Sequence, residues 1–162
     1  PWEESCRVPL LIRAPSLSIP GSKVTNIPVS LIDLYPTLVD LCGLPTDNRM
    51  DSGGAFLDGY SLRTLIENPE SKIWDGPDAA LTLIHDPKTS NKKGPHHYSI
   101  RSKNYRYIRY NNGKEELYDH RNDPYEWKNL AASRSKVSKM HREILLSMIQ
   151  DISKNRNRFK SR

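Results

Sequence analysis

Few side chains in this sequence have the type and spacing that enzymes use for chemistry. A nucleophilic site needs a Cys or Ser beside a base, but Cys6 and Cys42 both lie in a Cys-x-x-Pro context that matches neither a redox motif nor a cysteine protease. The pair Gly53-Gly54 alone is too short for a phosphate-binding loop. Compact Asp-x-Asp and His-x-His spacings do not occur in the sequence. We therefore assign no catalytic residue and no metal ligand.

The adjacent histidines His96 and His97 are the most distinctive polar pair. They follow a long polar loop, 85–95, and begin a predicted strand at 97–101. Successive side chains of a strand point to opposite faces, so the two imidazoles cannot bind one ion together without a bulge. Contact with a ligand and a plain surface location both remain open for each of them.

Aromatic and basic side chains alternate between residues 98 and 110. Such a surface could stack the bases of a nucleic acid. The simpler interpretation, which we favour, is an ordinary antiparallel sheet with its tyrosines under a helix and its arginines on the wet face. The residues concerned are Tyr98, Tyr105, Tyr107 and Tyr110, with Arg101, Lys103, Arg106 and Arg109.

The elements that must position these residues begin with one strand and one helix. Apolar residues fill 8–14 and recur at helical spacing over 30–41. Pro36 would break that helix unless Asp33 caps it, because a proline in the first turn has no intrahelical hydrogen bond to lose. One or two further helical turns are predicted at 62–66.

The second part of the chain predicts a small antiparallel sheet and a long helix. Asn111-Asn112-Gly113 favours a hairpin between the last two strands, because Asn and Gly tolerate positive φ. Residues 133–152 carry a single apolar stripe and give the clearest helix. Separate blocks of strands and helices are typical of an α+β fold. The four strand patterns are 79–84, 97–101, 105–110 and 116–119.

The net charge of +6 is concentrated at the C-terminal end. Between Arg134 and Arg162 lie nine basic and two acidic residues, so the rest of the chain is nearly neutral. We expect 154–162 to be a basic disordered tail, with an arm for nucleic acid or another anionic surface as the alternative. We therefore expect the chain to divide into two domains, residues 1–66 and 67–153, followed by this tail.

Several classes of protein are excluded by length and composition. The longest uninterrupted apolar runs, such as 10–12, are far shorter than the roughly 18 residues that span a membrane. Two cysteines cannot build a disulfide framework. The chain opens on Pro1, with no basic stretch followed by an apolar one, so we find no signal peptide and expect the back part of a longer protein.

Several stretches of the sequence, in this order and spacing, resemble the C-terminal portion of type I (formylglycine-dependent) sulfatases of the alkaline phosphatase superfamily. The nearest branch is similar to iduronate-2-sulfatases and arylsulfatases, and the resemblance covers most of residues 2–131. The stretches are 3–12 (EESCRVPLLI), 29–38 (VSLIDLYPTL), 40–45 (DLCGLP), 58–62 (DGYSL), 106–108 (RYI), 116–119 (ELYD) and 122–131 (NDPYEWKNLA).

The resemblance implies a fold and a reaction. The fold would be α+β: the last strand and helix of an alkaline-phosphatase-like α/β core, then a four-stranded antiparallel sheet packed on a long C-terminal helix. The full-length protein would hydrolyse sulfate esters, of a sulfated carbohydrate, with the aid of formylglycine and Ca²⁺. Family members usually work outside the cytoplasm, which implies a periplasmic or secreted location.

This chain departs from the family's active-site pattern. Neither Cys6 nor Cys42 has Pro two residues on and Arg four residues on. In the family the metal carboxylates and the active-site lysine come earlier as well. We therefore expect a C-terminal fragment that is inactive alone, binds no cofactor itself and needs the N-terminal catalytic portion of the same protein as its partner.

The remaining role of such a fragment is substrate selection and structural support. His96 and His97 are the predicted substrate-binding residues, because imidazole donors suit a sulfated sugar. The segment 122–131 is interpreted as structural: Trp127 and Leu130 pack, and Asn129 bonds to local backbone.

Other functions remain open. A phosphodiesterase or phosphonate hydrolase of the same superfamily would differ in its nucleophile motif. A nucleic-acid-binding module would use the tyrosine-rich sheet and the basic tail, and its affinity would fall steeply with salt. A noncatalytic interaction domain is a further alternative. We expect no membrane partner, and we disfavour nucleic acid.

Overall fold

The computed structural model describes residues 2–17, 19, 21–45, 57–85 and 96–160. The chain forms two compact units. The sheet unit comprises 1–9 and 79–150, and the helical unit comprises 10–78 and 151–162. The domain boundaries expected from the sequence stay a prediction. Gly53-Gly54, which is too short for a phosphate-binding loop by its sequence, lies outside the described residues.

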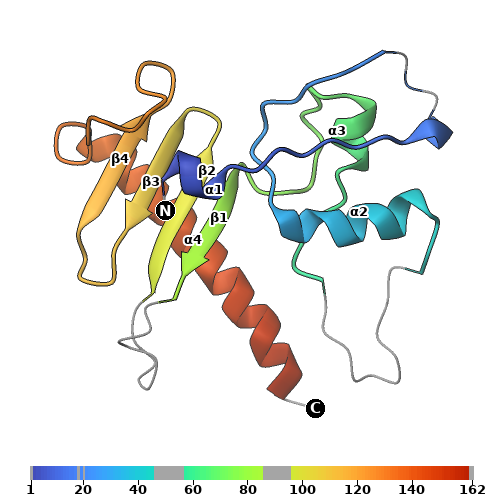
Figure 1. The fold of residues 1–162 in the computed structure, drawn as a ribbon. Helices are drawn as coiled ribbons and strands as arrows, with labels where there is room; N and C mark the ends of the chain where they lie inside the picture. Colours follow the sequence, from blue (N-terminus) through green and yellow to red (C-terminus); the bar gives the residue numbers. More distant parts are fainter. Residues whose placement is uncertain (1, 18, 20, 46–56, 86–95, 161–162) are drawn as a thin grey trace. The chain divides into compact units, whose positions relative to one another are not determined.

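The sheet unit is built on four antiparallel strands in sequential order (Figure 1). All four predicted strands are confirmed, with ends that differ by one residue. The hairpin at Asn111-Asn112-Gly113 is confirmed as well, since Gly113 has φ of 81° and the Tyr110 amide donates to the Lys114 carbonyl. The strands are β1 (Ala79–Ile84), β2 (His97–Ser102), β3 (Tyr105–Arg109) and β4 (Glu115–Asp119).

One face of the sheet packs against α4 (Ser135–Lys160). The fully buried residues of this core come from all four strands of the sheet and from the helix, so the apolar stripe predicted for the helix is confirmed. Tyr107 is completely buried in this layer, and Tyr98 and Tyr105 pack beside it. Three of the four tyrosines therefore lie under the helix, as expected, whereas Tyr110 packs against His97. The buried cluster is Ala79, Ile100, Tyr107, Leu117 and Leu145.

The opposite face of the sheet is covered by the start of the chain. Helix α1 (Glu3–Cys6) lies in front of the sheet in Figure 1, with α4 behind it. Ser99 and Arg106 point to the α1 side, because they alternate with Ile100 and Tyr107. Arg106 is 2% exposed, so the expectation that the arginines occupy a wet face is wrong for this residue. Its burial is made possible by carboxylates on α1 and on a distant loop.

Helix α4 is longer than the sequence predicts. It begins at Ser135 and continues to Lys160, so it includes most of 154–162, which we expected to be a disordered tail. No Gly or Pro occurs after Ile152 to stop the helix. No helix among the described residues is long and apolar enough to cross a membrane.

The helical unit contains the predicted helix at 30–41 in two pieces. A 3-10 turn, η2 (Leu31–Asp33), leads directly into α2 (Leu34–Leu41), which places Pro36 in the first turn as expected. Asp33 is the N-cap residue of α2, as predicted, but its side chain makes no capping bond to that helix. Its carboxylate instead accepts the Ser30 amide at 2.8 Å and the Tyr60 amide at 2.9 Å, so it caps the 3-10 turn and holds the 58–60 turn.

Two short helices complete the unit: η1 (Pro15–Leu17) and α3 (Arg63–Glu67). The helical turns expected at 62–66 are therefore confirmed with a shift of one residue.

The strand predicted at 8–14 is not formed. Residues 8–14 have no strand pairing within the described part of the chain, and Leu11 is 89% exposed. A single strand cannot satisfy its own amide groups and needs a neighbouring strand to pair with. The strand prediction for 8–14 is therefore wrong for this chain, whose described residues offer that run no ladder partner.

Candidate functional site

His96 and His97 lie at the start of β2, where the sheet opens toward the loop 86–95, which is outside the described residues. The two imidazoles take opposite sides, as the strand geometry predicts. His96 contacts the ring of His85, with centroids 5.5 Å apart, and meets Tyr98 edge-on. His97 instead packs against Tyr110, with centroids 5.6 Å apart.

The two histidines differ in their hydrogen bonds. His97 Nδ1 accepts the amide of Asn111 at 3.2 Å, which leaves Nε2 as its outward donor. His96 Nδ1 is buried and has no hydrogen-bond partner among the described residues. A buried nitrogen without a partner is costly, which makes His96 the better candidate for a bond to a molecule from outside.

His85 is the residue that sequence reasoning missed at this site. It follows Ile84, and Ile84 pairs with His97 across the β1–β2 ladder, so His85 is brought opposite His96. The available signal was the antiparallel register: two strands joined by a loop must bring the residues at both loop ends together. We refer to His85, His96 and Tyr98 together as the histidine cluster.

A cluster of charged side chains lies under α1, on the other face of the sheet. Arg106 Nε donates to Glu126 Oε1 at 2.7 Å, its Nη1 donates to Ser99 Oγ at 2.8 Å, and its Nη2 donates to Glu3. The Glu3 amide donates to Glu126 Oε2 at 2.8 Å. One buried guanidinium therefore joins the first residues of the chain to β3 and to the loop after β4.

Two further residues close this charged cluster. Arg101 Nε donates to Glu3 Oε2 at 3.1 Å, and Arg101 Nη2 donates to His120 Nδ1 at 3.0 Å. His120 Nε2 lies 2.8 Å from Glu126 Oε1. Because Nδ1 must accept from the guanidinium, the ring proton is assigned to Nε2, which donates to Glu126. Both ring nitrogens of His120 therefore have a hydrogen-bond partner.

The carboxylates of the cluster are held in their charged form. Burial alone would raise the pKa of Glu3, but the hydrogen bond from Arg106 and the charge of Arg101 outweigh it and lower that pKa. The pKa of Glu126 is also lowered, because the bonds from His120 and the Glu3 amide and the charge of Arg106 overcome burial. Burial lowers the pKa of Arg101 despite its contact with Glu3.

The same cluster contains a group of potential metal ligands, and these do not fit a cation. Oxygen and nitrogen atoms of Glu3, His120 and Glu126 lie within 4.8 Å of one another. However, Arg101 and Arg106 already occupy the space between them and donate to both carboxylates. A divalent ion would be placed beside two guanidinium charges and would have to displace their hydrogen bonds. We therefore assign the cluster a structural role.

A serine and a histidine also meet inside the core. Ser102 Oγ lies 2.9 Å from His141 Nε2, and His141 Nδ1 lies 2.9 Å from the Val137 carbonyl. Such a pair could suggest an activated nucleophile. Yet His141 is 1% exposed and its partner on Nδ1 is a backbone carbonyl, so the pair joins β2 to α4 and faces no cleft.

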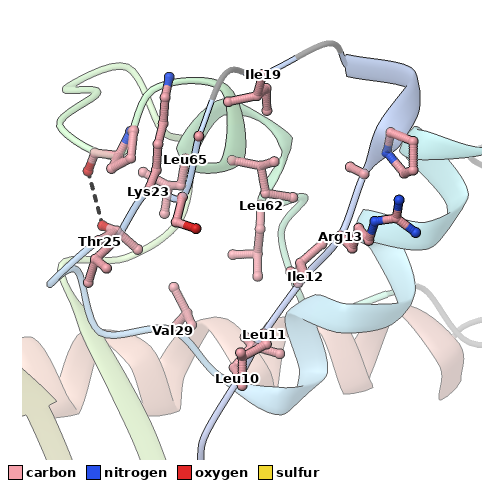
Figure 2. A pocket seen from close by; sticks show the side chains of 17 residues that line it. Leu10, Leu11, Ile12, Arg13, Ile19, Lys23, Thr25, Val29, Leu62 and Leu65 are labelled. Atoms are coloured by element: carbon pink, nitrogen blue, oxygen red, sulfur yellow. Dashed lines mark hydrogen bonds between the residues drawn. The ribbon is translucent and has the colours of Figure 1, made fainter.

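The helical unit has an apolar groove of about 790 Å³ (Figure 2). Leu10, Ile12, Leu62 and Leu65 line it, and Thr25 Oγ1 donates to the Pro69 carbonyl at its edge. Its lining residues, among those the structure describes, include no carboxylate or imidazole; the charged side chains are those of Arg13 and Lys23. Its wall along 10–15 is the stretch predicted to be a strand.

Comparison with known proteins identifies the family. A profile of the family "N-sulphoglucosamine sulphohydrolase, C-terminal" matches residues 1–156. The chain belongs to this C-terminal sulfatase family. The resemblance to sulfatases is thereby confirmed, and the α+β fold with its four-stranded antiparallel sheet agrees with sulfatase structures of the alkaline phosphatase-like fold.

Curated relatives are sulfatases as well. The chain is 31% identical over 144 residues to human arylsulfatase K, covering 85% of this chain and 24% of the relative. It is 27% identical over 161 residues to an ulvan-active sulfatase of Formosa agariphila, covering 99% of this chain and 29% of the relative. The chain therefore spans about a quarter of the length of the curated relatives it matches.

Solved structures show the same fold. A 2-O GAG sulfatase matches 80% of this chain and 26% of its own, with a TM-score of 0.56 and 27% identity. A phosphonate monoester hydrolase of Agrobacterium radiobacter also matches, with a TM-score of 0.54 and 28% identity over 74% of this chain and 24% of its own. The fold is thus shared by both enzyme classes, and the family profile with the curated relatives favours the sulfatase.

Proposed function

We propose that the full-length protein hydrolyses sulfate esters of a sulfated carbohydrate, and that this chain supplies its C-terminal sheet unit. The observation that supports this most directly is the match of residues 1–156 to a sulfatase C-terminal family. The ulvan-active relative points to a carbohydrate substrate. Formylglycine, Ca²⁺ and a periplasmic or secreted location are parts of the same proposal and come from the family resemblance alone.

Within that enzyme, the sheet unit would help to select the substrate through the histidine cluster. His96 supports this proposal because its Nδ1 has no partner among the described residues, while its ring is held between His85 and Tyr98. Imidazole N–H groups are good donors to sulfate and hydroxyl oxygens. His97 faces the other way, so a sugar bound on the His96 side would not contact it.

The second role is structural support of the catalytic portion. The helical unit exposes apolar side chains that a folded domain normally covers, among them Leu11 and the first turns of η2 and α2. We propose that polypeptide of the same protein, beyond this chain, packs on them. The exposed apolar residues of these segments are Leu11, Leu31, Ile32, Tyr35 and Leu38.

The test is hydrolysis by the full-length protein and four variants. We expect release of sulfate from a sulfated oligosaccharide. We expect His96→Ala and His85→Ala to raise KM for that substrate by about tenfold each, the loss of one charge-assisted hydrogen bond. Activity on a small aryl sulfate, which lacks the sugar, should change little.

His97→Ala is the matched control, since it removes the same side chain from the other face of the same strand. His141→Gln controls for a general loss of packing under α4. If His97→Ala raised KM as much as His96→Ala, the assignment of the substrate face would be wrong. If the full-length protein cleaved a phosphonate monoester and no sulfate ester, the second enzyme class would replace the first.

A further inference from the structure

Two aromatic rings stand out of the loop between β4 and α4. Tyr125 is 65% exposed and Trp127 is 84% exposed. The rings stack on each other, with centroids 5.3 Å apart and an angle of 22° between their planes. The expectation that Trp127 packs in the interior is therefore wrong, whereas Leu130 does pack on the core and Asn129 does bond to local backbone.

The loop holds this aromatic pair outward. The carboxylate of Asp123 accepts the amides of Trp127 at 3.0 Å and of Lys128 at 2.9 Å. Between the two rings, Glu126 has φ of 58° and turns its side chain inward to Arg106 and His120. An L-residue with positive φ is uncommon and needs compensation, which the buried carboxylate provides. The residues on either side of this inward carboxylate are the two exposed aromatic residues.

The loop that carries the aromatic pair also exposes cations. Lys128 is exposed and follows Trp127 directly. On the same loop Arg121 pairs with the buried Asp119, and Arg134 pairs with the same carboxylate, so two exposed guanidinium groups share one negative charge. The carboxylate of Asp123 accepts two backbone amides. The loop therefore combines two flat aromatic rings with the exposed cation of Lys128, next to Trp127 in the chain.

We propose that Tyr125 and Trp127 form a binding platform for a sugar ring of a sulfated polysaccharide. This platform is a site separate from the histidine cluster. The choice of a carbohydrate rests on the proposed function. A pyranose ring has a flat face of C–H groups that stacks on an aromatic ring, and its sulfate groups match the exposed ammonium group of Lys128, which follows Trp127. Exposed aromatic surface of this kind, on a loop held by hydrogen bonds to Asp123, is typical of a binding site.

The platform predicts that the protein prefers long substrates. A single sugar can occupy the catalytic site or the platform, whereas a polymer can bind both at once and gains affinity from the linkage. The substrate class is therefore a sulfated polymer or long oligomer, and a sulfated monosaccharide would not benefit from the platform.

The test measures retention of the full-length protein in native gels that contain iota-carrageenan or its desulfated form. We expect Trp127→Ala to lower the affinity for the sulfated polymer by about fivefold, a typical loss for one aromatic contact. Trp127→Phe should keep most of the affinity, because the ring plane is preserved. Trp127→Leu should behave like Trp127→Ala, and a matched surface variant, Ile73→Ala, which also removes an exposed apolar side chain, should bind as the wild type.

Several results would overturn the platform. Equal retention of Trp127→Ala and wild type would do so, and so would Trp127→Leu matching Trp127→Phe, since a stacking contact requires the ring. Loss of retention on single-stranded DNA instead of on polysaccharide would identify a base-stacking surface. Hydrolysis of an aryl sulfate separates the two proposals: retention through Trp127 without sulfatase activity would refute the proposed function and leave the platform standing.

Discussion

At the scale of single residues, Arg106 has the greatest structural consequence. It is a buried cation that joins α1, β2, β3 and the loop after β4 through Glu3, Ser99 and Glu126. A buried ion pair adds little net stability compared with an apolar replacement of all partners, but removing one partner leaves the others charged and buried. The partner carboxylates, not the cation alone, therefore set the cost of a substitution.

We predict that Arg106→Met lowers the free energy of unfolding by about 3–5 kcal/mol, because Glu3 and Glu126 lose their shared cation. The measurement is urea unfolding followed by circular dichroism. The matched control is Arg63→Met, which breaks the exposed ion pairs with Asp40 and Glu67 and should cost much less, because solvent screens exposed pairs. Equal losses for both variants would contradict the structural role of the cluster.

A second residue-scale prediction concerns pH. Burial lowers the pKa of His141, and the hydrogen bond to the Val137 carbonyl only partly opposes this. The unfolded chain therefore binds this proton more readily than the folded chain. Stability that depends on the neutral imidazole is complete above the unfolded pKa of about 6.5 and is lost as the pH falls below it.

The free energy of unfolding should therefore decrease between pH 7 and pH 5 in the wild type. His141→Gln removes the titrating group and should flatten this slope, although the variant will be less stable at every pH. A wild-type slope that persists in His141→Gln would assign the titration to another group.

A third prediction belongs to the elements. The 58–60 turn packs against the start of α2, and Asp33 Oδ1 accepts the Tyr60 amide at 2.9 Å. A Cβ on Gly59 would come within 2.2 Å of the Ile32 carbonyl oxygen, which is backbone and cannot move aside easily. We predict that Gly59→Ala costs about 1–3 kcal/mol, the usual range for overpacking.

Thermal unfolding of Gly59→Ala measures this cost. Gly113→Ala is the control: Gly113 has φ of 81°, but open space surrounds its Cβ position, so this variant should pay only the backbone penalty of about 1–2 kcal/mol. The two substitutions can also be separated by Asp33→Ala. If the Gly59 turn is already displaced in that variant, Gly59→Ala should cost less in it.

The elements also show how far the sequence alone could predict this molecule. The sheet strands and α4 were predictable, because alternation, the Asn-Gly turn and the 3.6-residue stripe are local signals. The Glu3–Arg106–Glu126 contacts were not, since Glu3 and Arg106 are 103 residues apart and no local pattern connects them. The strand at 8–14 failed for the opposite reason: its local pattern is strong, but pairing depends on chain elsewhere.

The candidate site follows the same division. His96 and His97 were identified by their adjacency and their position after a polar loop, and the strand period correctly placed them on opposite faces. His85 could be found only from the β1–β2 register. Trp127 was misplaced because its neighbours suggested packing, whereas the positive φ of Glu126, which the sequence does not reveal, turns Trp127 outward.

At the scale of the whole molecule, the first prediction concerns activity. The structure brings no nucleophile and base together at an open site within the described residues, and the carboxylate cluster is filled by arginines. We predict that the purified 162-residue chain does not hydrolyse sulfate esters, even with added Ca²⁺. Sulfate release from an aryl sulfate measures this, and turnover by the chain alone would refute the division of roles.

The last prediction uses one substitution in two contexts. Leu11 is 89% exposed in this chain, at the edge of the apolar groove, and we propose that further polypeptide of the protein covers it. Leu11→Lys should therefore improve the solubility of the isolated chain and lower its binding of a hydrophobic dye, because it removes exposed apolar surface. In the full-length protein the same change should lower the free energy of unfolding by about 1.5–3 kcal/mol or more, since it places a charge where a leucine is buried. Opposite signs in the two contexts would be difficult to obtain from a residue that stays in solvent in both. If Leu11→Lys left the full-length protein as stable as the wild type, this face would not be the contact with the catalytic portion.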